Sequence, residues 1–166
     1  MIDYSSLSRR LSHRSHTIPV SDSAATRSVI VPCAHCARLN RVDLARTDSV
    51  ARCGSCQTAL ALDAPLVLTD GNFDRVIEAS AVPVIVDFYA DWCGPCKAMV
   101  PVFADLARRQ RGQALVAKVD TDRNPAIAAR FGIRSIPTIA VMRGGKEVAR
   151  QVGALTIQGL EQLLRS

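Results

Sequence analysis

One stretch constrains the fold of this chain more than any other: the apolar run 82–90 and the two cysteines that follow it. The run is rich in β-branched and aromatic residues, which predicts a buried strand, and residues 93–110 continue with a helical pattern. Cys93 is therefore expected at the exposed end of the strand, where the helix begins, and Cys96 one turn further along. Two such cysteines can form a disulfide, and a helix N-terminus stabilises a thiolate on the first. The stretch predicts redox chemistry; half of a zinc site or two buried thiols are the alternatives for an isolated pair.

All six cysteines of the chain fall into three pairs with two residues between the partners, and the two N-terminal pairs have the spacing of a zinc site. Sixteen residues separate Cys33 and Cys36 from Cys53 and Cys56, which is typical of a structural site with four thiolates around one ion. The segment 29–62 is too short to build an adequate core, so the metal is expected to supply most of its folding free energy. Two incidental pairs are the alternative interpretation.

Two residues that lie between paired cysteines, Gly54 and His35, each have an expected role. Gly54 is expected to relieve the second turn, because glycine adopts backbone conformations that other residues avoid. His35 could replace a cysteine as ligand, but its position inside the first turn directs it outward. We expect an exposed polar residue there.

Residues 1–28 are predicted to be a disordered tail. They carry eight Ser, four Arg and only two acidic residues, without sustained apolar periodicity, so they cannot bury enough surface to offset the entropy of ordering. A transit peptide or a translation start placed too far upstream would have the same composition. The first thirty residues lack the apolar core of a signal peptide, and no apolar run has the length of a membrane helix.

The hexapeptide Trp92-Cys93-Gly94-Pro95-Cys96-Lys97 resembles the active site of the thioredoxin family. The resemblance continues through residues 64–166 and, with the four cysteines in front, extends to zinc-ribbon-bearing bacterial members of the thioredoxin 2 type. It implies an α/β fold in which helices cover both faces of a central mixed sheet. Cys93 is expected to be the nucleophile and Cys96 the thiol that resolves the mixed disulfide, while Gly94 and Pro95 keep the turn narrow and stiff.

Strands and helices are expected to alternate through the domain 63–166, in the order βαβαβαββα. The predicted strands are 66–69, 82–90, 114–120, 138–142 and 147–152, and the predicted helices are 72–80, 93–110, 125–131 and 156–164. Asp70 is expected to cap the first of these helices, and Pro101 to kink the second.

A carboxylate interrupts the apolar run before the cysteines. Asp87 lies six residues before Cys93, and because both faces of this strand look covered, we expect the carboxylate to be buried and its pKa to be raised. A surface carboxylate on a half-exposed strand is the alternative. The family resemblance implies that Asp87 accepts the proton of the second cysteine, Cys96, and that Lys118 is its partner.

The family resemblance also implies where substrates bind. The segment around Ile136 and Pro137 resembles the loop with a cis proline that offers a free backbone edge to a substrate peptide, whereas a trans proline is the usual state of such a bond. Gly153 and Ala154 match the third substrate loop, and Trp92, Gly94 and Pro95 complete the predicted surface. Tyr89 departs from the family, since many members have Trp at this position.

The resemblance implies a protein-disulfide reductase, which a flavin-dependent reductase recharges with electrons from NADPH. The paired cysteines do not have the scattered pattern of a secreted disulfide scaffold and favour a reducing compartment, so we expect a cytoplasmic monomer. One structural zinc ion is expected and no bound organic cofactor. The formal charge of +6 is spread without a dense basic patch, so nucleic acid is not an expected partner, and no membrane is expected either. An oxidase or isomerase would be expected to have another residue between the cysteines and an export signal. A zinc-dependent holdase or binding module that senses oxidants is the alternative from a different class.

Overall fold

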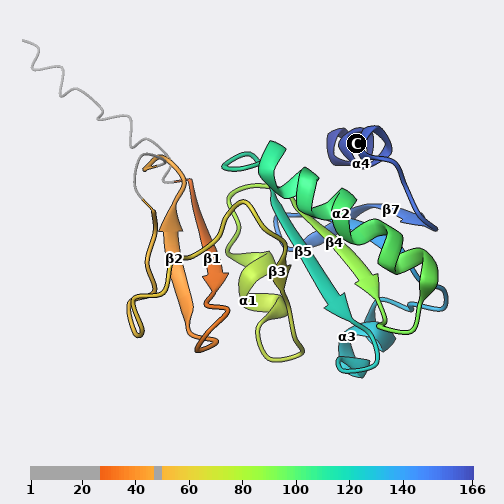
Figure 1. The fold of residues 1–166 in the computed structure, drawn as a ribbon, viewed down its shortest axis with the longest axis horizontal. Helices are drawn as coiled ribbons and strands as arrows, with labels where there is room; N and C mark the ends of the chain where they lie inside the picture. The colour runs from red at the N-terminus through yellow and green to blue at the C-terminus, as the bar shows by residue number, and fades with distance from the viewer. Residues whose placement is uncertain (1–26, 47–49) are drawn as a thin grey trace, which may run out of the picture.

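The computed structural model describes residues 27–46 and 50–166 and contains two β-sheets (Figure 1). The smaller sheet pairs β1 (Ser28–Pro32) with β2 (Leu39–Asp43). The larger sheet has the order β3-β5-β4-β6-β7, from β3 (Leu66–Val67), β4 (Val84–Tyr89), β5 (Leu115–Asp120), β6 (Thr138–Arg143) and β7 (Lys146–Val152). The helices of the described residues are α1 (Phe73–Glu78), α2 (Gly94–Arg109), α3 (Pro125–Arg130) and α4 (Ile157–Arg165).

The larger sheet is mixed, and helices cover both of its faces. β4 lies at its centre, parallel to β5 and antiparallel to β6. Ile85 of β4 packs in one buried cluster with side chains of α2 and α4, whereas Val86 and Phe88 pack in another with side chains of α1 and α3. The predicted fold class and the order βαβαβαββα are both confirmed.

The connection between β3 and α1 differs from the expectation. The helix begins at Phe73, and Asp70 does not cap it. The carboxylate of Asp70 instead accepts hydrogen bonds from the backbone N–H groups of Ile127 at 3.0 Å and Ala126 at 3.4 Å, in the first turn of α3. Asn124 completes this link, because its side-chain oxygen accepts from the N–H of Asp70 at 2.9 Å. Asp70 therefore binds the N-terminal turn of α3, a helix that lies far from it in the sequence.

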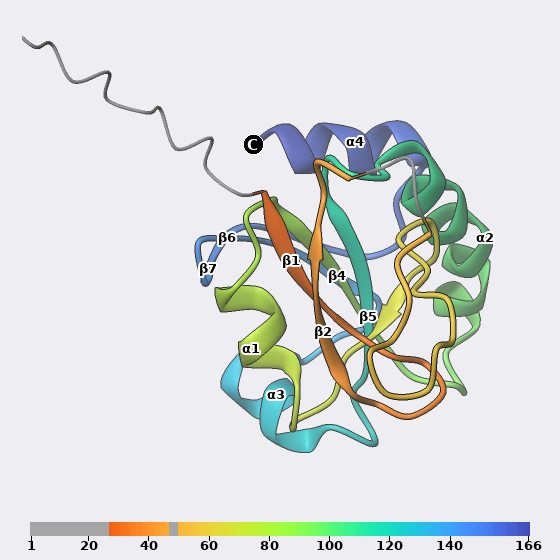
Figure 2. The ribbon, with the colours of Figure 1, turned by 90° about the vertical axis from the view of Figure 1, so that its left-hand side faces the viewer.

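The N-terminal ribbon, residues 27–46 and 50–62, packs against the α1 side of the larger sheet. Figure 2 shows β1 and β2 in front of this sheet with α1 beside them. Val29 and Val31 of β1 are fully or almost fully buried and belong to the same cluster as Phe73 and Val76 of α1. The two parts of the chain thus share one hydrophobic core.

Two hydrogen bonds reinforce this packing at the start of the ribbon. The N–H of Ala81 donates to the carbonyl of Ser28 at 3.0 Å, and the guanidinium of Arg27 donates to the carbonyl of Gly112 at 3.0 Å. Ser28 belongs to β1, although it falls at the end of the predicted tail; residues 1–26 of that tail lie outside the described residues. No helix in the described ranges combines the length and the apolar character that crossing a membrane requires.

The shared core predicts that damage to the ribbon weakens the whole molecule. Val29→Ala removes two buried methyl groups, so we expect the free energy of unfolding to fall by about 2 kcal/mol. Urea denaturation followed through the fluorescence of Trp92, the single tryptophan of the chain, reports on the C-terminal domain. Val50→Ala is the matched control in the ribbon, because Val50 is 61% exposed. An unchanged Trp92 transition in Val29→Ala would show that the two parts unfold independently.

Candidate functional site

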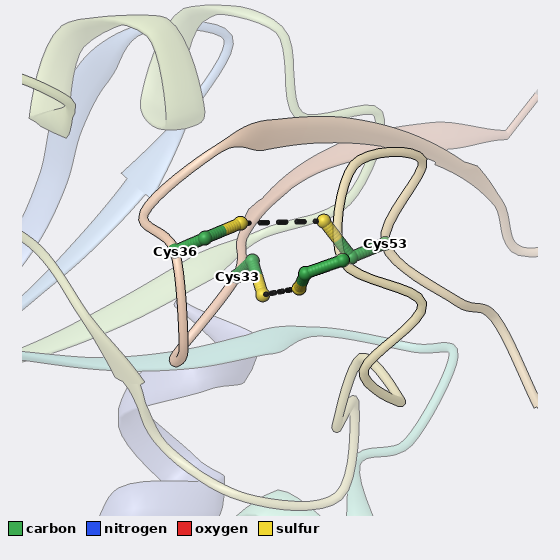
Figure 3. Close-up of side chains that lie close together, drawn as sticks. Cys33, Cys36 and Cys53 are labelled. Atoms are coloured by element: carbon green, nitrogen blue, oxygen red, sulfur yellow. Dashed lines mark hydrogen bonds between the residues drawn. The ribbon is translucent and has the colours of Figure 1, made fainter.

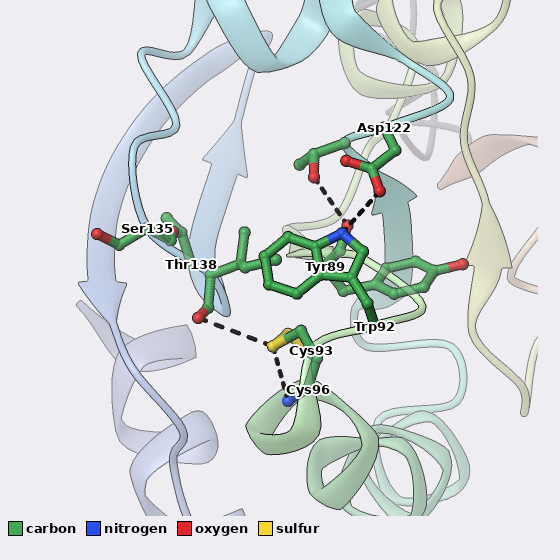
Figure 4. The surroundings of a disulfide bond; sticks show 9 residues. Tyr89, Trp92, Cys93, Cys96, Asp122, Ser135 and Thr138 are labelled. Atoms are coloured by element: carbon green, nitrogen blue, oxygen red, sulfur yellow. Dashed lines mark hydrogen bonds between the residues drawn. A yellow bond between two sulfur atoms is a disulfide. The ribbon is translucent and has the colours of Figure 1, made fainter.

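The disulfide between Cys93 and Cys96 lies where β4 ends and α2 begins (Figure 4). Cys93 is the N-cap residue of α2, and its Sγ accepts a hydrogen bond from the backbone N–H of Cys96 at 3.2 Å. Gly94 begins the helix, and Pro95 occupies the first turn, where a missing N–H is tolerated. In the reduced protein a thiolate on Cys93 is stabilised by the same N–H and by the positive end of the helix dipole.

Cys93 is less exposed to solvent than its position at the end of a strand predicts. Its exposed fraction is 3%, against 2% for Cys96. The reason is that Trp92 lies on one side of the disulfide and the segment between Ser135 and Thr138 on the other (Figure 4). The Sγ of Cys93 lies 3.8 Å from the carbonyl oxygen of Ile136 in that segment. A substrate sulfur therefore has to approach Cys93 between these two neighbours.

A residue that the sequence did not single out holds the Trp92 ring. The indole N–H of Trp92 donates to a carboxylate oxygen of Asp122 at 2.9 Å, although Trp92 is 71% exposed. Asp122 follows β5, and the neighbouring hydroxyl of Thr121 donates to the carbonyl of Tyr89 at 3.0 Å. Local sequence carries no signal for a contact that spans 30 residues; it arises because β4 and β5 are adjacent and parallel.

Asp87 is buried on the face of β4 that α2 covers. It is 6% exposed and lies opposite Lys118 of β5, and its Oδ1 has no hydrogen-bond partner among the described residues. Burial raises the pKa of Asp87 to about 7, although the positive charge of Lys118 lowers it in part. The ammonium of Lys118 also lies 5.5 Å from the centre of the Tyr89 ring. The carboxyl group therefore keeps its proton to a higher pH than an exposed aspartate does.

The predicted substrate loops meet at the same end of the sheet. The bond between Ile136 and Pro137 is cis, and the carbonyl of Pro137 accepts from the N–H of Gly153 at 2.8 Å. Gly153 has a φ of +98°, a conformation that strains any residue with a side chain. A Cβ at Gly153 would meet no atom within 4 Å, so its backbone, and not crowding within the chain, requires glycine here. Ala154 follows it and is exposed.

The other cysteines gather in the ribbon (Figure 3). The four sulfur atoms of Cys33, Cys36, Cys53 and Cys56 lie within 4.8 Å of one another. The shortest separations cross between the two pairs, at 3.5 Å for Cys33–Cys56 and 3.6 Å for Cys36–Cys53. A tetrahedral zinc ion with Zn–S bonds of about 2.3 Å places its sulfurs about 3.8 Å apart. The donor set and its spacing fit such an ion.

In the two turns that hold these cysteines, the residue with the left-handed backbone is not the expected Gly54. Each turn closes with a hydrogen bond of 2.9–3.0 Å from the N–H of Ala37 or Gln57 to the carbonyl of the first cysteine in its pair. Ala37 and Gln57 have φ values of +57° and +61°, so they, and not Gly54, take the left-handed conformation. His35 is exposed and stays outside the cluster of donor atoms, in agreement with the expectation.

Comparison with known proteins decides the family. The family model named Thioredoxin matches residues 64–166. The chain belongs to the thioredoxin family. A solved structure of a mutant thioredoxin from Halobacterium salinarum NRC-1 is similar in fold, with a TM-score of 0.58 and 36% sequence identity over 65% of this chain and 94% of that one. Thioredoxin 1 of Nostoc sp. is 44% identical over 103 residues, which are 62% of this chain and 96% of the relative.

One thioredoxin relative also matches part of the ribbon. Thioredoxin C-3 of Corynebacterium nephridii is 43% identical over 136 residues, which are 82% of this chain and 93% of the relative. The family model covers only residues 64–166, so the pairing extends into the segment that carries the four cysteines. The family match and the pair Cys93/Cys96 make the chain a thiol–disulfide oxidoreductase that reduces protein disulfides.

The raised pKa of Asp87 predicts how the stability of this thioredoxin depends on pH. The folded protein keeps a proton that the unfolded chain releases between about pH 4 and pH 7, so the free energy of unfolding should fall as pH rises through this window. Asp87→Asn cannot ionise and should be more stable than the parent at pH 8, by on the order of a few kcal/mol, since one pKa unit corresponds to about 1.4 kcal/mol. Urea denaturation of both oxidised proteins at pH 4 and pH 8 measures the effect. A gain that is equal at both pH values would contradict it.

Proposed function

We propose that Cys93 attacks the substrate disulfide and that Cys96 completes the reaction. The Cys93 thiolate bonds to one substrate sulfur and displaces the other as a thiolate, which forms a mixed disulfide. Cys96 then loses its proton and attacks the Sγ of Cys93, which releases the second substrate thiolate and leaves the Cys93–Cys96 disulfide. Two electrons pass from the enzyme dithiol to the substrate. The hydrogen bond from the Cys96 N–H to the Cys93 Sγ carries this assignment, because it marks Cys93 as the sulfur at the helix N-terminus.

Asp87 is the proposed acceptor of the proton from Cys96. Its carboxyl is buried, and a pKa of about 7 would let it take up a proton in one step and return it in another. No partner among the described residues occupies its Oδ1, so this oxygen remains available to a water or a thiol. Lys118, opposite Asp87 in the sheet, is proposed to keep the pKa of Asp87 from rising further.

The surface around the disulfide is the proposed docking site for disulfide-containing proteins. Trp92, Gly94 and Pro95 border it on the helix side, and the loops with Ile136, Pro137, Gly153 and Ala154 border it on the sheet side. An extended substrate segment would lie between them and would pair with the free backbone at Ile136. Trp92 lies beside Cys93 (Figure 4), and the carbonyl of Ile136, at the cis bond, lies 3.8 Å from the Cys93 Sγ; both observations support this assignment.

The oxidised enzyme needs a source of electrons, which we assign to an NADPH-dependent flavin reductase. A Bifunctional thioredoxin reductase/thioredoxin of Mycobacterium leprae is 47% identical over 98 residues, or 59% of this chain and 21% of the relative. Its name joins the two activities in one polypeptide, which supports a partnership of the same kind here. We assign no bound organic cofactor to this chain.

The four ribbon cysteines are proposed to hold one structural zinc ion. Thiolate ligands need a reducing environment, so we place the protein in the cytoplasm, and we propose that it acts as a monomer. When bound, zinc would cross-link the two turns of the ribbon. Cys33, Cys36, Cys53 and Cys56 would all be ligands.

Two serine variants test the order of the cysteines. Cys93→Ser should abolish reduction of insulin disulfides, with a loss of more than about a thousandfold, because no thiol is left to attack. Cys96→Ser should still attack but should stop at the mixed disulfide, which mass spectrometry of the trapped complex detects. Repeated turnover by Cys93→Ser, or trapping by Cys93→Ser and not by Cys96→Ser, would overturn the assignment.

Metal analysis tests the ribbon. Protein purified without chelators should contain one zinc per chain, and Cys36→Ser should contain much less. Because the ribbon shares its core with the domain, zinc removal should unfold the ribbon and also lower the urea midpoint of the Trp92 transition, while residues 64–166 remain folded without urea. Absence of zinc from the purified protein would refute the site, and an unchanged midpoint after removal would refute the coupling.

A further inference from the structure

A hollow of about 430 Å³ adjoins the disulfide on the side of the cis proline. Its lining consists of Trp92, Thr121, Ile133, Arg134, Ser135 and Ile136. Ile136 also carries the carbonyl that lies next to the Sγ of Cys93. A substrate whose sulfur bonds to Cys93 therefore places the residues beside its cysteine in or along this hollow.

The backbone of the hollow offers hydrogen-bond donors. The N–H groups of Arg134, Ser135 and Ile136 donate to no other group within the described part of the chain. The carbonyls of Ser135 and Pro137 already accept, from the hydroxyl of Thr138 and the N–H of Gly153. Among the described residues, the segment thus offers three free N–H groups beside the free carbonyls of Arg134 and Ile136.

The lining of the hollow also carries a positive charge. Arg134 is exposed, forms no ion pair with any described residue, and is the one charged side chain in the lining. The carboxylates at the ends of β4 and β5 lie outside this lining and keep their charge, but they contact other groups: Asp122 accepts from Trp92, while Asp91 and Asp120 lie 3.6 and 3.3 Å from the guanidinium of Arg123. The lining of the hollow therefore presents one exposed cation without an ion-pair partner among the described residues, together with free N–H groups.

We propose that Arg134 makes this thioredoxin prefer disulfides whose cysteine is flanked by a carboxylate side chain. The inference rests on the proposed reaction at Cys93 and adds the substrate class. An Asp or Glu beside the substrate cysteine would pair with the guanidinium of Arg134 and with the free N–H groups of the loop. The pair forms at an exposed site, so it supplies selectivity of a few-fold and is weakened by salt.

Three peptides, each closed by one disulfide and differing only in Glu, Gln or Lys beside a cysteine, test the proposal. The reduced full-length protein is mixed with each peptide, and the second-order rate constant of a single turnover is measured, so that no recharging enzyme is involved. The Glu peptide should react about two to five times faster than the Gln peptide, and the Lys peptide more slowly than both. The difference should shrink in about 0.5 M NaCl, where the screening length falls to about 4 Å.

Variants assign the preference to one side chain. Arg134→Gln should abolish the ratio between the rates with the Glu and Gln peptides, and Arg134→Lys should retain part of it. Arg75→Gln is the matched control, because it removes an equal exposed charge from α1, outside the lining of the hollow, and should leave the preference intact.

The possible failures are distinguishable. Equal rates for the Glu and Gln peptides with the parent protein, or a preference that survives in Arg134→Gln, would overturn the role of Arg134 and leave the reductase assignment standing. If the parent protein reduced none of the three peptides and also failed to reduce insulin, the proposed function itself would fall.

Discussion

The junction between β4 and α2 is the constraint on which the rest of the structure depends. Because β4 lies in the centre of the sheet and is covered on both faces, its direction and end point are fixed, and α2 follows it with Cys93 as N-cap and Gly94 as first residue. Trp92, the cis bond before Pro137 and Gly153 then surround that one point from separate parts of the chain. The geometry at Cys93 is thus set by the buried central strand of the larger sheet.

The ribbon is a part of this framework and not a separate appendage. Apolar side chains of the ribbon, among them Val29, Val31 and Leu60, are buried in the core that it shares with α1. A holdase would need a contiguous apolar surface for unfolded chains. Within the described part of the ribbon, Val50 is exposed, but the buried apolar side chains face the domain, which favours a structural role for the four-cysteine site over a binding module.

Local patterns predicted the features that depend on neighbouring residues. The apolar run before Cys93, the buried Asp87 and the spacing of the four ribbon cysteines all follow from short segments. Contacts between distant segments did not follow, because no local pattern encodes them. Asp70 was expected to cap α1, yet its carboxylate binds the first turn of α3, and the pairing of Trp92 with Asp122 depends on the adjacency of two strands. The packing of the ribbon on α1 has the same origin.

Selective alkylation tests the central claim, that the helix N-terminus makes Cys93 the reactive thiol. The fully reduced, zinc-loaded protein is treated with a limiting amount of iodoacetamide at about pH 7, and the modified peptides are mapped by mass spectrometry. Cys93 should be alkylated first, with Cys96 and the four ribbon cysteines modified at least about tenfold more slowly. Alkylation of Cys96 at the same rate as Cys93, or ahead of it, would contradict the account.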